Sequence, residues 1–294
     1  MYTRILVAVG DSSWSDAAIA YASALAARTG AALRIVTVLH TPTASSAPDV
    51  AGCSIHELAD IEHQGQVIAT RAAAQATSAG VTYEAHCLWG SVPEVILNQA
   101  ADCDLIVLGS RGVLGWKRLF AGSIINAVAA KATQPVAVVK TSATPPAPLG
   151  RRLLVAVGSS PWSREALEHA LQLAQAQNLE LCVLHVDHMW PRRGEYPTHS
   201  DGKNLLTWAE ARAAMIGVAY EGILAEGLVL DAILNTATYK SCDTIVMGSR
   251  GIVGWKRLVL GDIANSVIAK APQPVFVVKH FFDPEDPRRR RIRL

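Results

Sequence analysis

Short apolar runs alternate along this chain with longer segments in which apolar residues recur every three or four positions. Residues 5–9 form a continuous apolar run, which is typical of a strand buried on both faces of a parallel sheet. The next segment places its apolar residues on one stripe of a helix: Trp14, Ala17, Ala18, Tyr21 and Leu25. Gly30 follows this stripe and marks the end of the helix.

The same alternation continues through the chain. Further strands are predicted at residues 33–39, 83–88, 105–108, 135–140, 179–186, 245–247 and 274–279. Further helices are predicted at residues 55–79 and 203–216, and from near Ser123 and Asp262. Ser91 and Glu94 have the spacing of a capping box, and Ser160-Pro161 is a cap followed by proline at the first helical position. This order predicts an α/β fold with helices on both faces of a mainly parallel sheet.

The chain carries this pattern twice. The stretch GSRGVLGWKRLFAGSI at residues 109–124 returns as GSRGIVGWKRLVLGDI at residues 248–263, and 22 of 32 positions match between residues 109–140 and 248–279. We therefore expect two doubly wound domains, each with a five-stranded sheet, over residues 1–142 and 150–282. A proline-rich linker covers residues 143–149, and a basic tail covers residues 283–294.

The last predicted strand of each copy is short and apolar, at residues 136–140 and 275–279. An unpaired strand of this kind at a sheet edge invites aggregation. The two copies are therefore predicted to pair with each other through these strands, and a homodimer of the whole chain is a further possibility that the pattern leaves open.

Composition narrows the class of protein. Half of the 294 residues are hydrophobic, which is typical of a globular chain, and no apolar run reaches the ~20 residues that a membrane span needs. The five cysteines are scattered and never spaced as CxxC, which favours reduced thiols and a cytoplasmic location. Five arginines lie in the last seven residues, so the rest of the chain is slightly acidic and nucleic-acid binding is not expected.

The repeated stretch has the pattern Gly109-x2-Gly112-x9-Gly122-Ser123, between a buried strand and a helix. A helix N-terminus presents free N–H groups and a favourable dipole to an anion, and glycines let the backbone approach phosphate oxygens. Arg111 could neutralise phosphate charge. The alternative is that these glycines only break the chain between strand and helix.

This pattern resembles the nucleotide loop of the ATP-binding universal stress proteins, and the resemblance covers almost the whole chain in tandem form. It implies an adenine nucleotide alpha-hydrolase-like fold, a regulatory role in the stress response, and ATP as ligand, with or without Mg²⁺. It also implies that the end of the second strand, at Val38, meets the adenine. The nucleotide-contacting positions that it marks are Asp11, Val38, Gly109, Arg111, Gly112, Gly122, Ser123, Ile124, Val186, Gly248, Arg250, Gly251 and Gly261.

The sequence departs from the family pattern in two places. Members of the family usually carry Asp directly after the first strand, whereas here Gly10 precedes Asp11, which can either reach the nucleoside or merely favour the turn. The second copy has no acid there, and Asp262 stands where the first copy has Ser123. A carboxylate at that helix N-terminus is expected to cap it and to repel phosphate. ATP is therefore expected mainly in the first copy.

Two other functions compete with a nucleotide-binding regulator. A slow ATPase ranks lower because no base for water is evident, and a nucleotide-free scaffold is favoured by the missing Asp after both first strands. A metal site at His185, Asp187, His188 and His199 is disfavoured because the spacing fits no zinc pattern.

Overall fold

The computed structural model describes residues 2–40, 55–110, 122–141, 148–158, 160–187, 199–249 and 260–279. The first copy contains five strands, β1 (Arg4–Val9), β2 (Ala32–Leu39), β3 (Tyr83–Trp89), β4 (Leu105–Ser110) and β5 (Val136–Lys140). Its helices are α1 (Ser13–Thr29), α2 (Ile55–Ser78), α3 (Val92–Gln99) and α4 (Ser123–Lys131). Every predicted element of this copy is present.

The second copy repeats this order. Its strands are β6 (Arg152–Val157), β7 (Glu180–Asp187), β8 (Tyr220–Glu226), β9 (Thr244–Gly248) and β10 (Val275–Val278). Its helices are α5 (Pro161–Gln177), α6 (His199–Met215), α7 (Val229–Tyr239) and α8 (Asp262–Lys270). None of the helices among the described residues is both long and apolar enough to cross a membrane.

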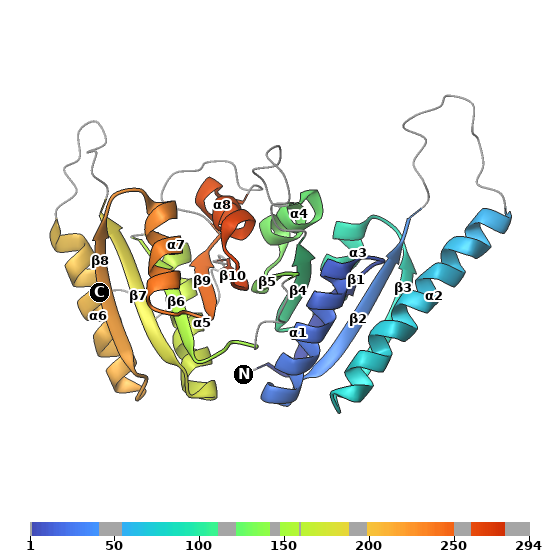
Figure 1. Ribbon diagram of the computed structural model, residues 1–294, viewed down its shortest axis with the longest axis horizontal. Helices are drawn as coiled ribbons and strands as arrows, with labels where there is room; N and C mark the ends of the chain where they lie inside the picture. The colour runs from blue at the N-terminus through green and yellow to red at the C-terminus, as the bar shows by residue number, and fades with distance from the viewer. Residues whose placement is uncertain are drawn as a thin grey trace, which may run out of the picture.

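All ten strands join in one sheet with the order β3-β2-β1-β4-β5-β10-β9-β6-β7-β8 (Figure 1). Within each copy every pairing is parallel, as the alternation of strands and helices predicts. In the first copy β2 and β3 lie on one side of β1 in the sheet, and β4 and β5 lie on the other side. The crevice between β1 and β4 is therefore a topological switch point, and β6 and β9 form its counterpart.

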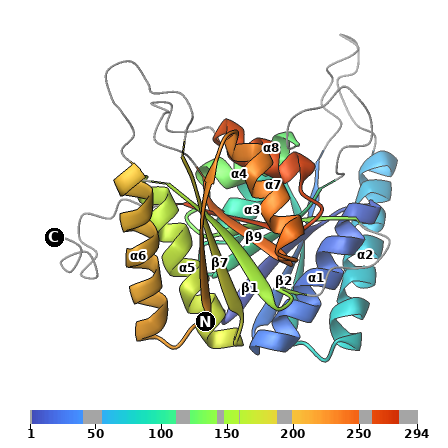
Figure 2. The ribbon, with the colours of Figure 1, turned by 60° about the vertical axis from the view of Figure 1, so that its left-hand side comes forward.

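Helices cover both faces of the sheet. α1, α2, α5 and α6 pack on one face, and α3, α4, α7 and α8 pack on the other, where α4 and α8 lie side by side near the middle of the molecule (Figure 2). Two buried apolar cores fill these layers, and both contain residues from the two copies. The ten strands therefore share continuous cores and form one body.

Most of the predicted helix ends are confirmed. Gly30 closes α1 in the left-handed conformation, and the Ser160 side chain accepts the Ser163 N–H at the start of α5. The predicted capping box at Ser91 is wrong, because its side chain makes no capping hydrogen bond. An N-cap side chain bonds the second or third helical N–H, and here Pro93 removes one of those two donors.

The predicted pairing of the copies through their last strands is confirmed. β5 and β10 are antiparallel, with Phe276 opposite Ala137. Lys140 Nζ donates to the carbonyls of Ala269 and Ala271 at 2.7 and 2.6 Å, and Lys279 Nζ donates to the Ala130 carbonyl at 2.7 Å. Each copy thus supplies a cation to the C-terminal end of the last helix of the other copy, where the helix dipole favours positive charge.

A second contact between the copies lies near the N-terminus. The hydroxyl of Tyr2, which is buried, lies 3.0 Å from Nε2 of the partly buried His169 on α5. Arg28 on α1 donates to the Gln177 side chain at 3.0 Å and to the carbonyls of Pro148 and Gly150 at 2.9 and 3.0 Å. The end of the linker is thereby tied to both copies.

His169 makes this contact sensitive to acid. Burial lowers the pKa of His169 from 6.5 to about 4. As the pH falls, the unfolded chain takes up this proton before the folded chain does. The contribution of neutral His169 to the free energy of unfolding is therefore complete above pH 6.5 and is lost as the pH falls toward 4. Between pH 6.5 and 4 the free energy of unfolding should fall in both proteins, but by about 2 kcal/mol less in His169→Gln than in the unmodified protein. Each pKa unit corresponds to about 1.4 kcal/mol, and the partial exposure of His169 reduces the effect.

Chemical denaturation at several pH values measures this difference. His56→Gln is the matched control, because His56 is exposed on α2, and it should keep the profile of the unmodified protein. Superimposable profiles for the unmodified protein and His169→Gln would contradict the assignment.

Candidate functional site

The predicted site residues that the structure describes lie at the carboxyl ends of the strands or at the N-termini of α4 and α8. Asp11 follows β1, Val38 is near the end of β2, and Gly109 is the next-to-last residue of β4. Gly122, Ser123 and Ile124 begin the segment that enters α4. Arg111, Gly112, Arg250 and Gly251 lie outside the described residues. In the first copy the described positions surround the switch point between β1 and β4, where open α/β sheets bind ligands.

The N-terminus of α4 is open. Gly122 is the N-cap residue, has no side chain to cap the helix, and adopts a φ of −55°, which any residue can adopt. A Cβ placed on Gly122 would meet nothing within 4 Å among the described residues. Ser123 and Ile124 are exposed. Among the described residues, therefore, neither packing at Gly122 nor a capping side chain covers the N-terminus of α4, and such a helix end suits an anion.

The equivalent helix of the second copy carries a carboxylate, but not as a cap. Gly261 is the N-cap residue of α8, Asp262 is its first helical residue, and no side chain makes a capping hydrogen bond. The prediction that Asp262 caps the helix is therefore wrong, because only a residue one position earlier reaches the second and third N–H groups. Its exposed charge still lies in the first turn, where it repels phosphate.

The glycines at the ends of β4 and β9 have a packing reason that the sequence does not reveal. A Cβ on Gly109 would lie 2.1 Å from the carbonyl oxygen of Trp14, and one on Gly248 would lie 2.7 Å from the carbonyl carbon of Trp162. The first turns of α1 and α5 thus press directly on these strands. Close approach of helix and strand is sufficient to require glycine at both positions.

Asp11 is exposed and faces α2. Its Oδ1 lies 3.7 Å from Nη2 of Arg71, which also lies 3.3 Å from Oδ1 of Asp16. Ser12, the next residue, caps α1 by accepting the Ser15 N–H at 3.3 Å. Arg71 is a neighbour of the site that the sequence pattern does not signal, because it comes from a helix sixty residues away from Asp11 in the chain.

The ends of β2 and β7 differ in a way that the sequence analysis missed. Thr37, beside Val9 in the sheet, is buried, and its hydroxyl has no hydrogen-bond partner among the described residues. In the second copy the same register position beside Val157 is His185. Its Nδ1 lies 3.0 Å from the Val157 carbonyl oxygen and its Nε2 lies 3.3 Å from Oδ1 of Asp187. Here His185 of the second copy has partners on both ring nitrogens, whereas the Thr37 hydroxyl of the first copy has none within the part of the chain that the structure describes.

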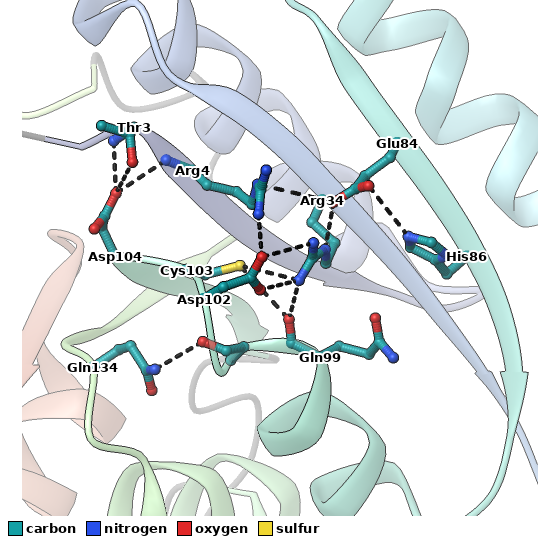
Figure 3. Close-up of polar contacts among 11 residues, drawn as sticks. Thr3, Arg4, Arg34, Glu84, His86, Gln99, Asp102, Cys103, Asp104 and Gln134 are labelled. Atoms are coloured by element: carbon teal, nitrogen blue, oxygen red, sulfur yellow. Dashed lines mark hydrogen bonds and ion pairs between the residues drawn. The ribbon is translucent and has the colours of Figure 1, made fainter.

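The opposite edge of the first copy, at the amino ends of its strands, holds a cluster of charges (Figure 3). Arg34 pairs with Glu84 and Asp102, and Arg4 also pairs with Asp102. The Arg34 guanidinium lowers the pKa of both carboxyls. Asp104 accepts from the backbone N–H of Thr3 at 2.6 Å. The arginines and carboxylates of this edge therefore pair with one another and link the amino ends of β1, β2 and β3 to the turn before β4.

The fold and the two switch points define a class of protein, a tandem pair of doubly wound α/β domains with one open and one acid-bearing helix N-terminus. The chain matches the universal stress protein family twice, over residues 1–140 and 150–279. It therefore belongs to the universal stress protein family, as the sequence resemblance implies.

Known relatives agree with this assignment. A universal stress protein of Mycolicibacterium smegmatis is 26% identical over 294 residues, which cover 94% of this chain and 96% of the relative. The universal stress protein YxiE of Bacillus subtilis is 34% identical over 149 residues, which cover 44% of this chain and 98% of the relative. Among solved structures, a universal stress protein from Archaeoglobus fulgidus has the same fold, with a TM-score of 0.76, 24% identity and coverage of 94% and 98% of the two chains.

Proposed function

We propose that this protein is an ATP-binding regulator of the stress response, and that its first copy, taken as residues 1–142, holds the nucleotide. The phosphates would lie at the N-terminus of α4, at Gly122 and Ser123, with Arg111 and Gly112 in the adjoining loop. The nucleoside would lie near Asp11 and Val38. The second copy, residues 150–282, would act mainly as a structural partner in the cytoplasm.

The observation that carries this proposal is the open N-terminus of α4. Its N-cap residue has no side chain, and a Cβ there would meet no atom within 4 Å among the described residues. Phosphate oxygens would satisfy the free N–H groups and gain from the helix dipole. α8 has the same backbone but carries Asp262 in its first turn, so a phosphate there would face a like charge.

The buried hydroxyl of Thr37 supports the position of the nucleoside. It lies beside Val9 at the end of β1 and lacks a partner among the described residues. A buried polar group without a partner costs about 1–3 kcal/mol, so a ligand that reaches it would recover part of that cost. A nucleoside offers hydroxyl and ring-nitrogen groups for this purpose. His185 fills the corresponding position in the second copy, which further favours binding in the first.

Calorimetric titration of ATP at fixed Mg²⁺ and salt tests the proposal in four proteins. The unmodified chain should show one strong site. Ser123→Asp should lose at least about tenfold in affinity, because it places a charge in the first turn of α4 and mimics the second copy. Ser123→Ala should lose about 1–3 kcal/mol, the value of one hydrogen bond to a charged acceptor. Asp262→Ser should gain a second, weaker site.

Two equal sites in the unmodified chain, or affinity that is indifferent to Ser123→Asp, would contradict the proposal. Two further measurements separate the competing functions. Mass spectrometry of the denatured purified protein detects a co-purified nucleotide, which a nucleotide-free scaffold would lack. Phosphate release over hours separates a binding protein from a slow ATPase.

A further inference from the structure

The sheet has two outermost strands, β3 in the first copy and β8 in the second (Figure 1). The residues that flank β3 both bond to β2. The Thr82 carbonyl accepts the Leu33 N–H at 2.9 Å, and the Gly90 N–H donates to the Leu39 carbonyl at 3.0 Å. Since backbone groups alternate in direction along a strand, the odd-numbered residues of β3 point their N–H and C=O groups away from β2. These residues, with which no described strand pairs on that side, are Tyr83, Ala85, Cys87 and Trp89.

The two outermost strands differ in charge. Charged side chains usually protect such a strand from further pairing. The exposed Glu226 ends β8, whereas the equivalent end of β3 is Trp89. Trp89 and Tyr83, at the two ends of β3, are each 39% exposed. Glu84 is the acidic residue of β3, and Arg34 on β2 pairs with it at 2.5 Å. β3 therefore presents an edge of little net charge with an aromatic side chain at each end.

The side of α2 that lies over β3 is also largely uncharged. Glu62 on this side accepts a hydrogen bond from the Trp89 indole at 3.1 Å. Side chains three or four residues apart lie on the same side of a helix. The next positions on this side of α2 are Gln66, Thr70, Ala73 and Thr77. A second helix can therefore approach α2 here without burying a charge.

The matching side of α6 does carry charge. A Cβ on Gly65 of α2 would lie 2.7 Å from Sγ of Cys87. Gly202 of α6 is equivalent, because its Cβ would lie 3.0 Å from Leu224, which has the same register position on β8. Counted from Gly202, the matching positions are Lys203, Thr207, Glu210 and Ala214. Two of these four side chains are charged, so the edge of the second copy is protected and that of the first copy is not.

The sequence of β3 is complementary to itself in one antiparallel register. If two β3 strands pair with His86 at the centre, Tyr83 is opposite Trp89 of the partner subunit, and Ala85 is opposite Cys87 of the partner subunit. All four of these residues direct their backbone groups outward, so each pair exchanges two hydrogen bonds. Aromatic pairs across strands are stabilising. A shift of two residues in either direction separates Tyr83 from Trp89 and loses one of these pairs.

The charges of β3 fit the same register. Glu84 would be opposite Leu88 of the partner subunit and diagonal to His86 of the partner subunit. Within one chain Glu84 already lies 3.7 Å from Nε2 of His86. No two carboxylates of β3 would be directly opposite, an arrangement that destabilises paired strands.

The helices also fit this pairing. α2 packs on β2 and β3, and neighbouring strands lie about 4.8 Å apart. Two strand spacings would therefore separate α2 from α2 of the partner subunit, which is about 10 Å and close to the distance between packed helices. The uncharged sides of the two helices would then meet.

We propose that a second copy of this chain docks on β3 and forms a twofold dimer. The two sheets join through antiparallel β3 strands, in the manner in which β5 and β10 already join the two halves of each chain. The interface is isologous and closed, and both β8 strands remain on the outside. This dimer does not depend on nucleotide binding.

Sedimentation equilibrium of the full chain at micromolar concentrations tests the proposal, and we expect a dimer. Ala85→Pro should be a monomer, because proline removes an outward N–H, while the hydrogen bonds from β3 to β2 are made by other residues. Glu226→Pro is the matched control. The Leu181 N–H donates to the Ala219 carbonyl, so on β8 the even-numbered residues face outward. This variant should remain a dimer.

A pair of variants at Leu88 separates pairing from folding. Both remove the same apolar side chain, but Leu88→Glu places a carboxylate opposite Glu84 of the partner subunit, whereas Leu88→Lys places a cation there. Each contact occurs twice in a twofold dimer, so Leu88→Glu should dissociate at least about tenfold more readily than Leu88→Lys. An unmodified protein that stays monomeric, a dimer indifferent to Ala85→Pro, or equal dissociation constants for the two Leu88 variants would overturn the proposal.

Discussion

Gly109→Ala should destabilise the protein by about 3 kcal/mol. The new Cβ would lie 2.1 Å from the carbonyl oxygen of Trp14, 2.6 Å from its carbonyl carbon and 3.1 Å from the Ser15 nitrogen. These are backbone atoms of the first turn of α1, so α1 must move away from β4. Overpacking a core costs about 1–3 kcal/mol and more when backbone must shift. Alanine also lowers the conformational entropy of the unfolded chain relative to glycine, which offsets at most about 1 kcal/mol of this destabilisation.

Denaturant titration measures the effect, and Gly122→Ser is the matched control from the same motif. A Cβ at Gly122 meets nothing within 4 Å among the described residues, and serine is a favourable N-cap residue. Its stability should be unchanged or higher by up to about 1 kcal/mol, while ATP affinity should fall, since the serine hydroxyl would occupy the helix N-terminus. Equal stability of Gly109→Ala and the unmodified protein would show that α1 does not press on β4 as described.

Phe276→Ala should cost about 3–5 kcal/mol, the range for removing a buried aromatic side chain. Phe276 is fully buried on β10 and lies opposite Ala137 on β5, at the point where the two copies meet. The cavity would open at the junction of the two halves of the sheet. Unfolding followed by circular dichroism in denaturant gives the loss, and two separate transitions would appear if the copies became uncoupled.

A double variant separates the effect of the lost core volume from the effect of where the aromatic ring is attached. Ala137→Phe with Phe276→Ala moves the ring to the equivalent site on the other copy, since the two residues are direct cross-strand partners in the same core. It should recover about half of the loss from Phe276→Ala, because the total volume of the core is restored. A double variant that is as unstable as the sum of its single variants would mean that the two copies are not interchangeable at this junction.

The sequence was sufficient to predict the architecture. Strand and helix periodicity depend on neighbours within a few residues, so the elements could be predicted with small errors at their ends. β3, for example, runs to Trp89 rather than residue 88, and β7 begins at Glu180 rather than residue 179. The duplication and the short apolar last strands predicted that β5 pairs with β10, because an unpaired edge of that kind is costly, and the structure adds that the pairing is antiparallel.

The candidate site was only partly predictable. The loop motif and the resemblance directed attention to Gly109, Gly122 and Ser123, and the structure places all three at one edge of the sheet. Asp262 was assigned as a cap because a one-residue difference in where a helix starts is not readable from composition. The Thr37 hydroxyl, which is buried and has no partner in the described part of the chain, carries no signal in the sequence, because a threonine in a strand is ordinary there.

The sequence by itself therefore determined the order of the elements, the twofold repeat and the pairing of the copies, because these follow from local periodicity and from the need to cover an apolar edge. Only the tertiary structure decided which atoms approach one another: α1 against Gly109, and Arg71 beside Asp11. Such contacts join segments far apart in the chain, and their distances depend on how helices seat on the sheet. Residue spacing along the chain does not encode that seating.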